Sequence, residues 1–128
     1  MPRRQSIHLT GFAHRNPVPA ACRVGPLLLS GALTGRDGSG AMPAGLDAQM
    51  ANVFAHVREL MDAAAGSIDD IVKMTFLLAS YRDRAALNEQ WVAMFPSSED
   101  RPTRHCIAAT LDGGSLVQCD VVAWVGER

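Results

Sequence analysis

The sequence of 128 residues lacks the features that mark several large classes of protein. No run approaches the ~18 consecutive apolar residues that a membrane-spanning helix needs. The start is basic, but no apolar segment of signal-peptide length follows it. Lys and Arg do not cluster, and the formal charge is −1, so nucleic acid is not an expected partner. We therefore expect a cytoplasmic protein that binds neither a membrane nor nucleic acid.

Signals for metals and nucleotides are also missing. The three cysteines, Cys22, Cys106 and Cys119, are an odd number and show no short C-x-x-C spacing. This pattern argues against a disulfide framework and a zinc site, and favours free, buried thiols. The glycine-rich segment 35–45 contains neither the P-loop pattern nor G-x-G-x-x-G. The sequence therefore predicts no metal site and no nucleotide.

The residues that are present have an ordinary globular composition, with 48% apolar and 20% charged residues. At this length, such a composition suits one domain with one core. No internal repeat and no linker interrupt the sequence. We expect residues 1–128 to form a single domain.

Hydrophobic periodicity predicts two helices. Over residues 46–65, apolar residues recur at i, i+3, i+4 and i+7, and Gly66 lies where a glycine commonly ends a helix. Ser80 and Asp83 form an S-x-x-D start signal for a second helix, which ends near Pro96. The apolar stripe of this second helix consists of Leu87, Trp91, Met94 and Phe95.

Short apolar runs predict the strands. One strand is expected around residues 7–12, and the runs 20–24 and 27–30 predict a hairpin. Residues 101–125 predict a second hairpin, in which an Asp-Gly-Gly turn joins two strands. Between the helices, alternation predicts a strand whose buried face carries Val72, Met74, Phe76 and Leu78.

This order of elements predicts an α+β fold with both helices on one face of a mainly antiparallel sheet. In the last strand, the face that suits the helices is formed by Val117, Cys119, Val121, Ala123 and Val125. The opposite face carries Val122 and Trp124, which are too apolar for a solvated surface. We therefore expect self-association through the open face, giving a closed homo-oligomer.

Polar residues within the second hairpin are the candidates for chemistry. Alternation puts Arg104 and Cys106 on one face of its first strand and His105 on the other. If Arg104 and Gln118 both face the open side of the sheet, a guanidinium lies beside an amide at a subunit seam. There it binds a substrate carboxylate, or it pairs with Asp120 or with a carboxylate of a neighbouring subunit.

Several neighbouring positions leave two interpretations open. His105 is a strand or interface histidine, or a titrating group in catalysis. Cys106 is a small buried filler or an activated thiol. Asn88 is a solvated helix residue, or it braces a loop backbone. Ser30 and Gly31 form a turn, or they offer a hydroxyl and a backbone N–H to a ligand.

Four segments carry a family resemblance over nearly the whole chain from about residue 16. They are "RVGPLLLSG" (23–31), "LDAQMANVFAHVRELMDAAAGSIDDIVKMTFLL" (46–78), "RAALNEQWVAMF" (84–95) and "RPTRHCIAATLDGGSLVQCDVVA" (101–123). They resemble the Rid family of small enamine and imine deaminases, also called YjgF/UK114 or endoribonuclease L-PSP. The specific residues are Gln49, Asn52, Ala65-Gly66-Ser67, Asp70-Ile71-Val72-Lys73, Asn88, Phe95 and Pro102-x-Arg104.

The resemblance implies a chorismate-mutase-like (ferredoxin-like) α+β sandwich that forms a homotrimer with three clefts at the subunit seams. It implies that Arg104 binds the substrate carboxylate and that Ser30, Gly31, Asn88 and Cys106 line the cleft. In deaminating members, water adds to a 2-imino or 2-enamino acid, ammonia leaves and a 2-keto acid forms, without a metal or an organic cofactor.

The chain departs from the deaminating members at two cleft positions. Gln118 stands where they carry a glutamate that helps to activate water, and an amide cannot take a proton as a carboxylate can. Val18 stands where they carry a tyrosine. Asp120 lies roughly 7 Å from Gln118 along the same strand face, where it either orients water or neutralises Arg104. His14 is a further residue within reach of the cleft.

Three functions remain open at this point. The first is a hydrolase that deaminates carboxylate-bearing imines or enamines, of which the 2-aminomuconate deaminases look like relatives, with Arg104, Gln118 and Asp120 in the catalytic set. The second is a non-catalytic trimer that binds a small metabolite or acts as a chaperone, which Gln118 and Val18 favour. The third is a ribonuclease, against which the charge and the lack of a basic stripe argue.

Overall fold

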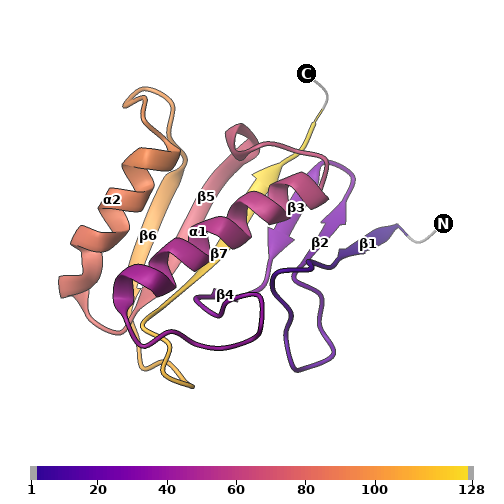
Figure 1. Cartoon of the computed structure of the whole chain (residues 1–128). Helices are drawn as coiled ribbons and strands as arrows, with labels where there is room; N and C mark the ends of the chain where they lie inside the picture. The colour runs from indigo at the N-terminus through magenta and orange to yellow at the C-terminus, as the bar shows by residue number, and fades with distance from the viewer. Residues whose placement is uncertain (1–2, 127–128) are drawn as a thin grey trace.

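The computed structural model describes residues 3–126, and its sheet is centred on the last strand of the chain (Figure 1). The sheet has the order β1-β2-β3-β7-β5-β6, and a short strand β4 also pairs with β7. Every strand pair is antiparallel except β5 with β6. The strands are β1 (Arg4–Ile7), β2 (Ala21–Val24), β3 (Leu27–Ser30), β4 (Leu33–Thr34), β5 (Ile71–Leu78), β6 (Thr103–Ala108) and β7 (Val117–Trp124).

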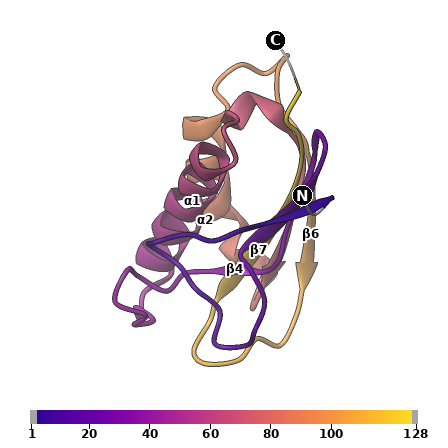
Figure 2. The ribbon, with the colours of Figure 1, turned by 90° about the vertical axis from the view of Figure 1, so that its right-hand side faces the viewer.

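Two helices, α1 (Leu46–Ala63) and α2 (Arg84–Met94), cover one face of this sheet and leave the other face open (Figure 2). Short 3-10 helices, η1 (Ile68–Asp70) and η2 (Tyr81–Asp83), precede β5 and α2. The predicted α+β sandwich is confirmed. None of the helices within residues 3–126 has the length and apolar character to cross a membrane.

The core lies between the helices and the sheet, as the periodicity predicts. All five residues of the expected apolar face of β7 are buried, and so are the four stripe residues of α2. In α1, the buried side of the helix includes Met50, Val53, Val57 and Leu60, none of which is exposed to solvent. The alternation of β7 therefore decides which of its side chains are available for a site: Gln118, Asp120, Val122 and Trp124 point to the open face.

The predicted C-terminal hairpin is wrong, because β6 and β7 do not pair with each other. Strand β5 lies between them, parallel to β6 and antiparallel to β7. The chain reaches β6 from β5 through α2, which is the helical crossover that a parallel strand pair requires. The Asp-Gly-Gly segment is therefore part of a longer connection between strands two places apart in the sheet.

The start and the middle of the chain correct three local predictions. The first strand is Arg4–Ile7 rather than 7–12. Val72 is 50% exposed, since a bulge between Ile71 and Lys73 shifts the register and Ile71 takes the inward position. Ala65, with φ of 57°, takes the left-handed position after α1 that was expected for Gly66. Gly66 is tightly packed instead: a Cβ there would lie 3.0 Å from Asp70 Oδ2 and 3.1 Å from the Val125 side chain, so these neighbours would have to shift to admit a larger residue.

Candidate functional site

Arg104 lies on the helix-covered face of the sheet, at its outer edge beside α2. In the parallel register it pairs with Met74, a core residue, so its side chain points to the same side. The guanidinium carbon lies 5.0 Å from the centroid of the Trp91 ring. Within residues 3–126 the Arg104 side chain has no hydrogen bond or ion pair. The half-buried Arg104 guanidinium therefore contacts the Trp91 ring, while its N–H groups donate no hydrogen bond to residues 3–126.

A hollow of about 470 Å³ opens beside this guanidinium, lined by Tyr81, Arg84, Arg104 and Cys106. The Tyr81 hydroxyl donates to the Cys106 carbonyl oxygen at 3.2 Å, which ties η2 to β6. At the preceding turn, Ser80 Oγ accepts a hydrogen bond from the Arg82 N–H at 3.2 Å and starts η2. Tyr81, which lies within the S-x-x-D segment, therefore forms part of the wall of this hollow.

Gln118 and Asp120 lie on the opposite face of the sheet from Arg104. Gln118 pairs with Leu77 and with Thr34, and Asp120 pairs with Thr75. The condition that Arg104 and Gln118 both face the open side is therefore not met. Nor does Asp120 form an ion pair with Arg104, because the sheet separates them and β5 lies between their strands.

His105 shares the open face with Asp120. It pairs with Thr75 of β5, which in turn pairs with Asp120 of β7, so the three residues form one row across the sheet. Neighbouring strands lie about 4.8 Å apart, which puts His105 and Asp120 about 10 Å from each other. They flank Thr75 in this row and are too far apart for a direct hydrogen bond.

Ser30 and Gly31 serve the backbone of the sheet. Ser30 Oγ accepts from the Val121 N–H at 2.8 Å and donates to the Gly31 carbonyl oxygen at 2.8 Å. The Gly31 N–H donates to the Ala20 carbonyl oxygen at 2.9 Å. Ser30 is the last residue of β3, and these hydrogen bonds tie the end of β3 to β7 and to the residue before β2, so Ser30 and Gly31 do not form the expected turn.

The remaining predicted site residues lie at two separate places. Asn88 is exposed on α2 and has no side-chain hydrogen bond within residues 3–126. Val18 is 53% exposed and lines a hollow of about 410 Å³ together with His14. The buried Nε2 atom of His14 has no partner among the described residues, and a Cβ at Gly31 would lie 3.6 Å from it. The structure therefore brings together His14, Val18 and Gly31, away from Arg104.

Comparison with known proteins decides the family. The profile of the family described as endoribonuclease L-PSP matches residues 13–125. The chain belongs to the endoribonuclease L-PSP family. This family, also named Rid, includes enamine and imine deaminases. RidA from an Antarctic Psychrobacter species is 28% identical with a TM-score of 0.87, over 94% of this chain and 99% of that one.

Two further solved structures show the same fold. A hypothetical protein from Giardia lamblia is 27% identical with a TM-score of 0.87, over 96% of this chain and 99% of that one. TdcF from E. coli, solved with bound serine, is 21% identical with a TM-score of 0.87, over 95% and 99%. The fold expected from the resemblance is thus confirmed.

The thiols of this L-PSP family member are free, as expected. Only Cys119 is buried, as expected; Cys22 and Cys106 are half-buried, so the expectation of buried thiols is wrong for these two. Burial raises the pKa of the Cys119 thiol well above its ordinary value, and the nearby Asp120 and Cys106 raise it further. Residues 3–126 contain no group of three His, Cys, Asp or Glu side chains placed to hold a metal ion.

The sequence did not predict that Tyr81 and Arg84 line the hollow beside Arg104. It also did not predict that Trp91 contacts the Arg104 guanidinium. Tyr81 and Arg84 were not among the predicted site residues, and Trp91 was predicted only as a core residue. The incorrect hairpin hid their position, because it places β6 beside β7 rather than at the outer edge next to η2. The signal that would have found them is the crossover from β5 through α2 to β6.

Proposed function

We propose that the protein is a cytoplasmic, homotrimeric hydrolase that deaminates small carboxylate-bearing imines or enamines. The observation that carries the proposal is the unpaired guanidinium of Arg104 at the edge of a hollow. A guanidinium binds a carboxylate through two parallel hydrogen bonds and keeps its charge when partly buried. The relative TdcF was solved with serine, a small molecule that carries such a carboxylate.

In this proposal, a second copy of the chain completes each site. Arg104 and Gln118 lie on opposite faces of one sheet, so a single chain does not present both to the same small molecule. The open face also exposes large apolar side chains, which favours contact with another copy. They are Leu27, Leu29, Ile107 and Trp124. Closed rotational symmetry between the copies then forms the same interface at each subunit.

The proposed reaction needs a positioned carboxylate and a proton acceptor for water. Water adds to the carbon of the C=N bond, the nitrogen takes up protons, and ammonia leaves as the C–N bond breaks, which yields a 2-keto acid. An enamine first takes a proton at carbon and becomes the imine. Arg104 holds the substrate carboxylate. Gln118 orients water by hydrogen bonding, and the exposed carboxylate of Asp120 on the same face accepts its proton.

A second candidate is a trimer that binds a small carboxylate without turnover. Gln118 favours it, because an amide has no proton-accepting capacity to offer the attacking water. Both candidates use Arg104 for the anion and differ only in whether ammonia is released.

The Arg104→Ala variant tests the first candidate. The 2-imino acid is generated in the assay by an amino acid oxidase, and the protein-dependent increase in ammonia release is measured. We expect kcat/KM to fall by about 100-fold, because the variant leaves the substrate carboxylate without its charged partner.

The matched control is Arg82→Ala, an exposed arginine of η2 that does not line the hollow. We expect it to retain the wild-type rate. Full activity of Arg104→Ala on every accepted imine rules out the assigned site. Ligand-induced thermal stabilisation without ammonia release favours the binding protein.

A further inference from the structure

The hollow beside Arg104 contains a second arginine that the proposed reaction does not use. Arg84 is the first residue of α2, and its Nε donates to the Tyr81 carbonyl oxygen at 3.1 Å. Its guanidinium carbon lies 5.3 Å from the centroid of the Tyr81 ring. Within residues 3–126 its two terminal nitrogens make no hydrogen bond or ion pair. One nitrogen therefore anchors the group, and the others stay available.

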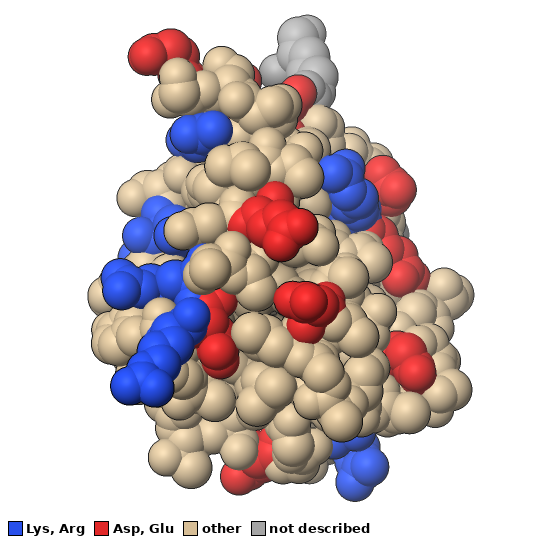
Figure 3. All heavy atoms as spheres, turned by 60° about the vertical axis from the view of Figure 1, so that its left-hand side comes forward, with Lys and Arg blue, Asp and Glu red and all other residues tan. Residues whose placement is uncertain are grey.

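Two like charges line this hollow, and no carboxylate among residues 3–126 forms an ion pair with either of them. The lining consists of Tyr81, Arg84, Arg104 and Cys106, and none of these is acidic. Asp83 precedes Arg84 in the chain, but within the described residues it forms no ion pair with it and makes no side-chain cap bond to α2. Figure 3 brings this side of the molecule forward and shows Lys and Arg side chains along its left border, with Asp and Glu side chains next to them. A negatively charged ligand offsets the repulsion between the two arginines.

We propose that Arg84 binds a second acidic group of the substrate, so that the preferred substrates are imines or enamines of small dicarboxylic acids. This inference rests on the proposed function, in which Arg104 holds the carboxylate next to the reacting carbon. Tyr81 lies beside Arg84 and is tied to β6, so the wall that carries Arg84 is fixed relative to Arg104. One molecule of water and a 2-imino dicarboxylate then give a 2-keto dicarboxylate and ammonia.

The test compares two product-like ligands that differ only at the far end of a five-carbon chain. 2-Oxoglutarate ends in a carboxylate, and 2-oxopentanoate ends in a methyl group. Binding of each is measured by calorimetry at constant ionic strength with the intact protein. We expect 2-oxoglutarate to bind about 10-fold more tightly, because one charge-assisted interaction is gained. The Arg84→Gln variant loses this preference and leaves the affinity for 2-oxopentanoate unchanged.

The matched control is Arg82→Gln on η2, which we expect to keep the preference. Equal wild-type affinity for the two acids overturns the inference, and so does an Arg84→Gln variant that keeps the preference or weakens both ligands equally. The Arg104→Gln variant separates the two proposals, because it must weaken both ligands if Arg104 binds the shared carboxylate. If Arg104→Gln weakens neither ligand, or if neither acid binds the wild type, the proposed function is wrong. If the wild type binds both acids equally well and Arg104→Gln abolishes this binding, only the proposed role of Arg84 is wrong.

Discussion

A single side chain, Gln49, shows how much one buried polar residue organises in this protein. It is fully buried on α1, where Nε2 donates to the Pro43 carbonyl oxygen at 2.7 Å and to the Gly114 carbonyl oxygen at 3.0 Å. Its Oε1 accepts from the Leu116 N–H at 2.8 Å. Gly35 packs so closely that a Cβ there would lie 2.5 Å from the Gln49 Cβ. The glycine-rich loop and the connection to β7 therefore meet at one amide.

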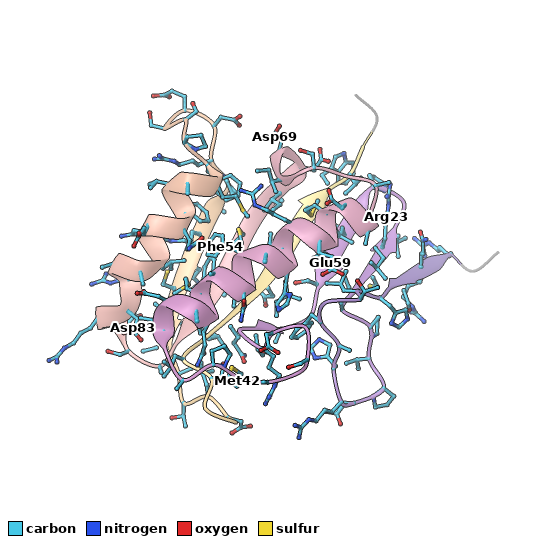
Figure 4. All side chains as sticks on the ribbon, in the orientation of Figure 1. Arg23, Met42, Phe54, Glu59, Asp69 and Asp83 are labelled. Carbon is cyan, nitrogen blue, oxygen red and sulfur yellow. The ribbon has the colours of Figure 1, made fainter. Side chains whose placement is uncertain are left out.

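Glu59 on α1 holds the segment that follows β1 through hydrogen bonds. Figure 4 shows its position on the helix. Its Oε1 accepts from the backbone N–H groups of Thr10 and Gly11, at 2.8 and 3.0 Å, and from the Thr10 hydroxyl at 3.0 Å. The hydrogen bond from Gly11 is the largest cause that lowers the pKa of this carboxyl below its ordinary value of 4.5. The charged form is therefore the one that holds the N-terminal segment on α1.

This lowered pKa predicts a pH dependence of stability. A folded-state pKa below the unfolded value stabilises the protein above pH 4.5, and this contribution is lost as the pH falls through the folded-state pKa. In urea unfolding between pH 7 and pH 3, we expect Glu59→Gln to lower stability at pH 7 by about 0.5–1 kcal/mol. It should also reduce the loss below pH 4.5. Glu89→Gln, exposed on α2, serves as the control, and identical pH curves for wild type and Glu59→Gln contradict this role.

Individual site residues were predictable in identity but not in relation to one another. Arg104 stands out as a charged residue within a predicted strand, and the structure gives it an aromatic partner and a hollow. Alternation correctly separated the faces within β6 and within β7. It could not align the faces of the two strands, because that requires knowing which strand lies between them.

At the scale of elements, the residue after the C-terminal end of α1 has an unfavourable backbone conformation. The Gly66 N–H donates to the Met61 carbonyl oxygen, and the Ala65 N–H donates to that of Asp62, which is the Schellman pattern. Arg23 adds a hydrogen bond from Nη1 to the Ala64 carbonyl oxygen at 2.7 Å. Ala65 occupies the left-handed position of this motif, where a Cβ is unfavourable.

We expect Ala65→Gly to stabilise the protein by about 0.5–1 kcal/mol, because glycine takes positive φ without a steric penalty. The control is Ala55→Gly in the exposed middle of α1, which should destabilise by about 1 kcal/mol. Both are measured as shifts in the urea midpoint at a fixed protein concentration. If Ala65→Gly is as destabilising as Ala55→Gly, position 65 is not strained.

Local patterns predicted the elements better than their pairing. The helices, the β2–β3 hairpin and the buried face of β7 follow from residue spacing. The pairing of β5 with β6 does not, because a turn-like Asp-Gly-Gly sequence between two apolar runs has the same appearance in a hairpin as in a longer connection. The bulge at Val72 was equally hidden, since it changes register without an unusual residue.

For the whole molecule, the open face of the sheet predicts an assembly. We expect sedimentation of the wild type at about three times the chain mass of 13.7 kDa at micromolar concentration. Leu29→Asp places a charge on this face, where Leu29 is 44% exposed and pairs with Val122, and should shift the protein toward the monomer. The control is Val92→Asp on α2, which is 48% exposed away from this face. A monomeric wild type contradicts the trimer.

The central place of β7 in the sheet determines when the sheet can be completed during synthesis. β7 comes after β3 and β5 in the chain and pairs with both, so neither can complete its hydrogen bonding before synthesis has passed residue 124. Until then the nascent chain exposes two unpaired strand edges and the apolar side of α1. The sheet therefore closes only after β7 has been synthesised, and a premature stop before β7 removes the strand that joins the two parts of the sheet.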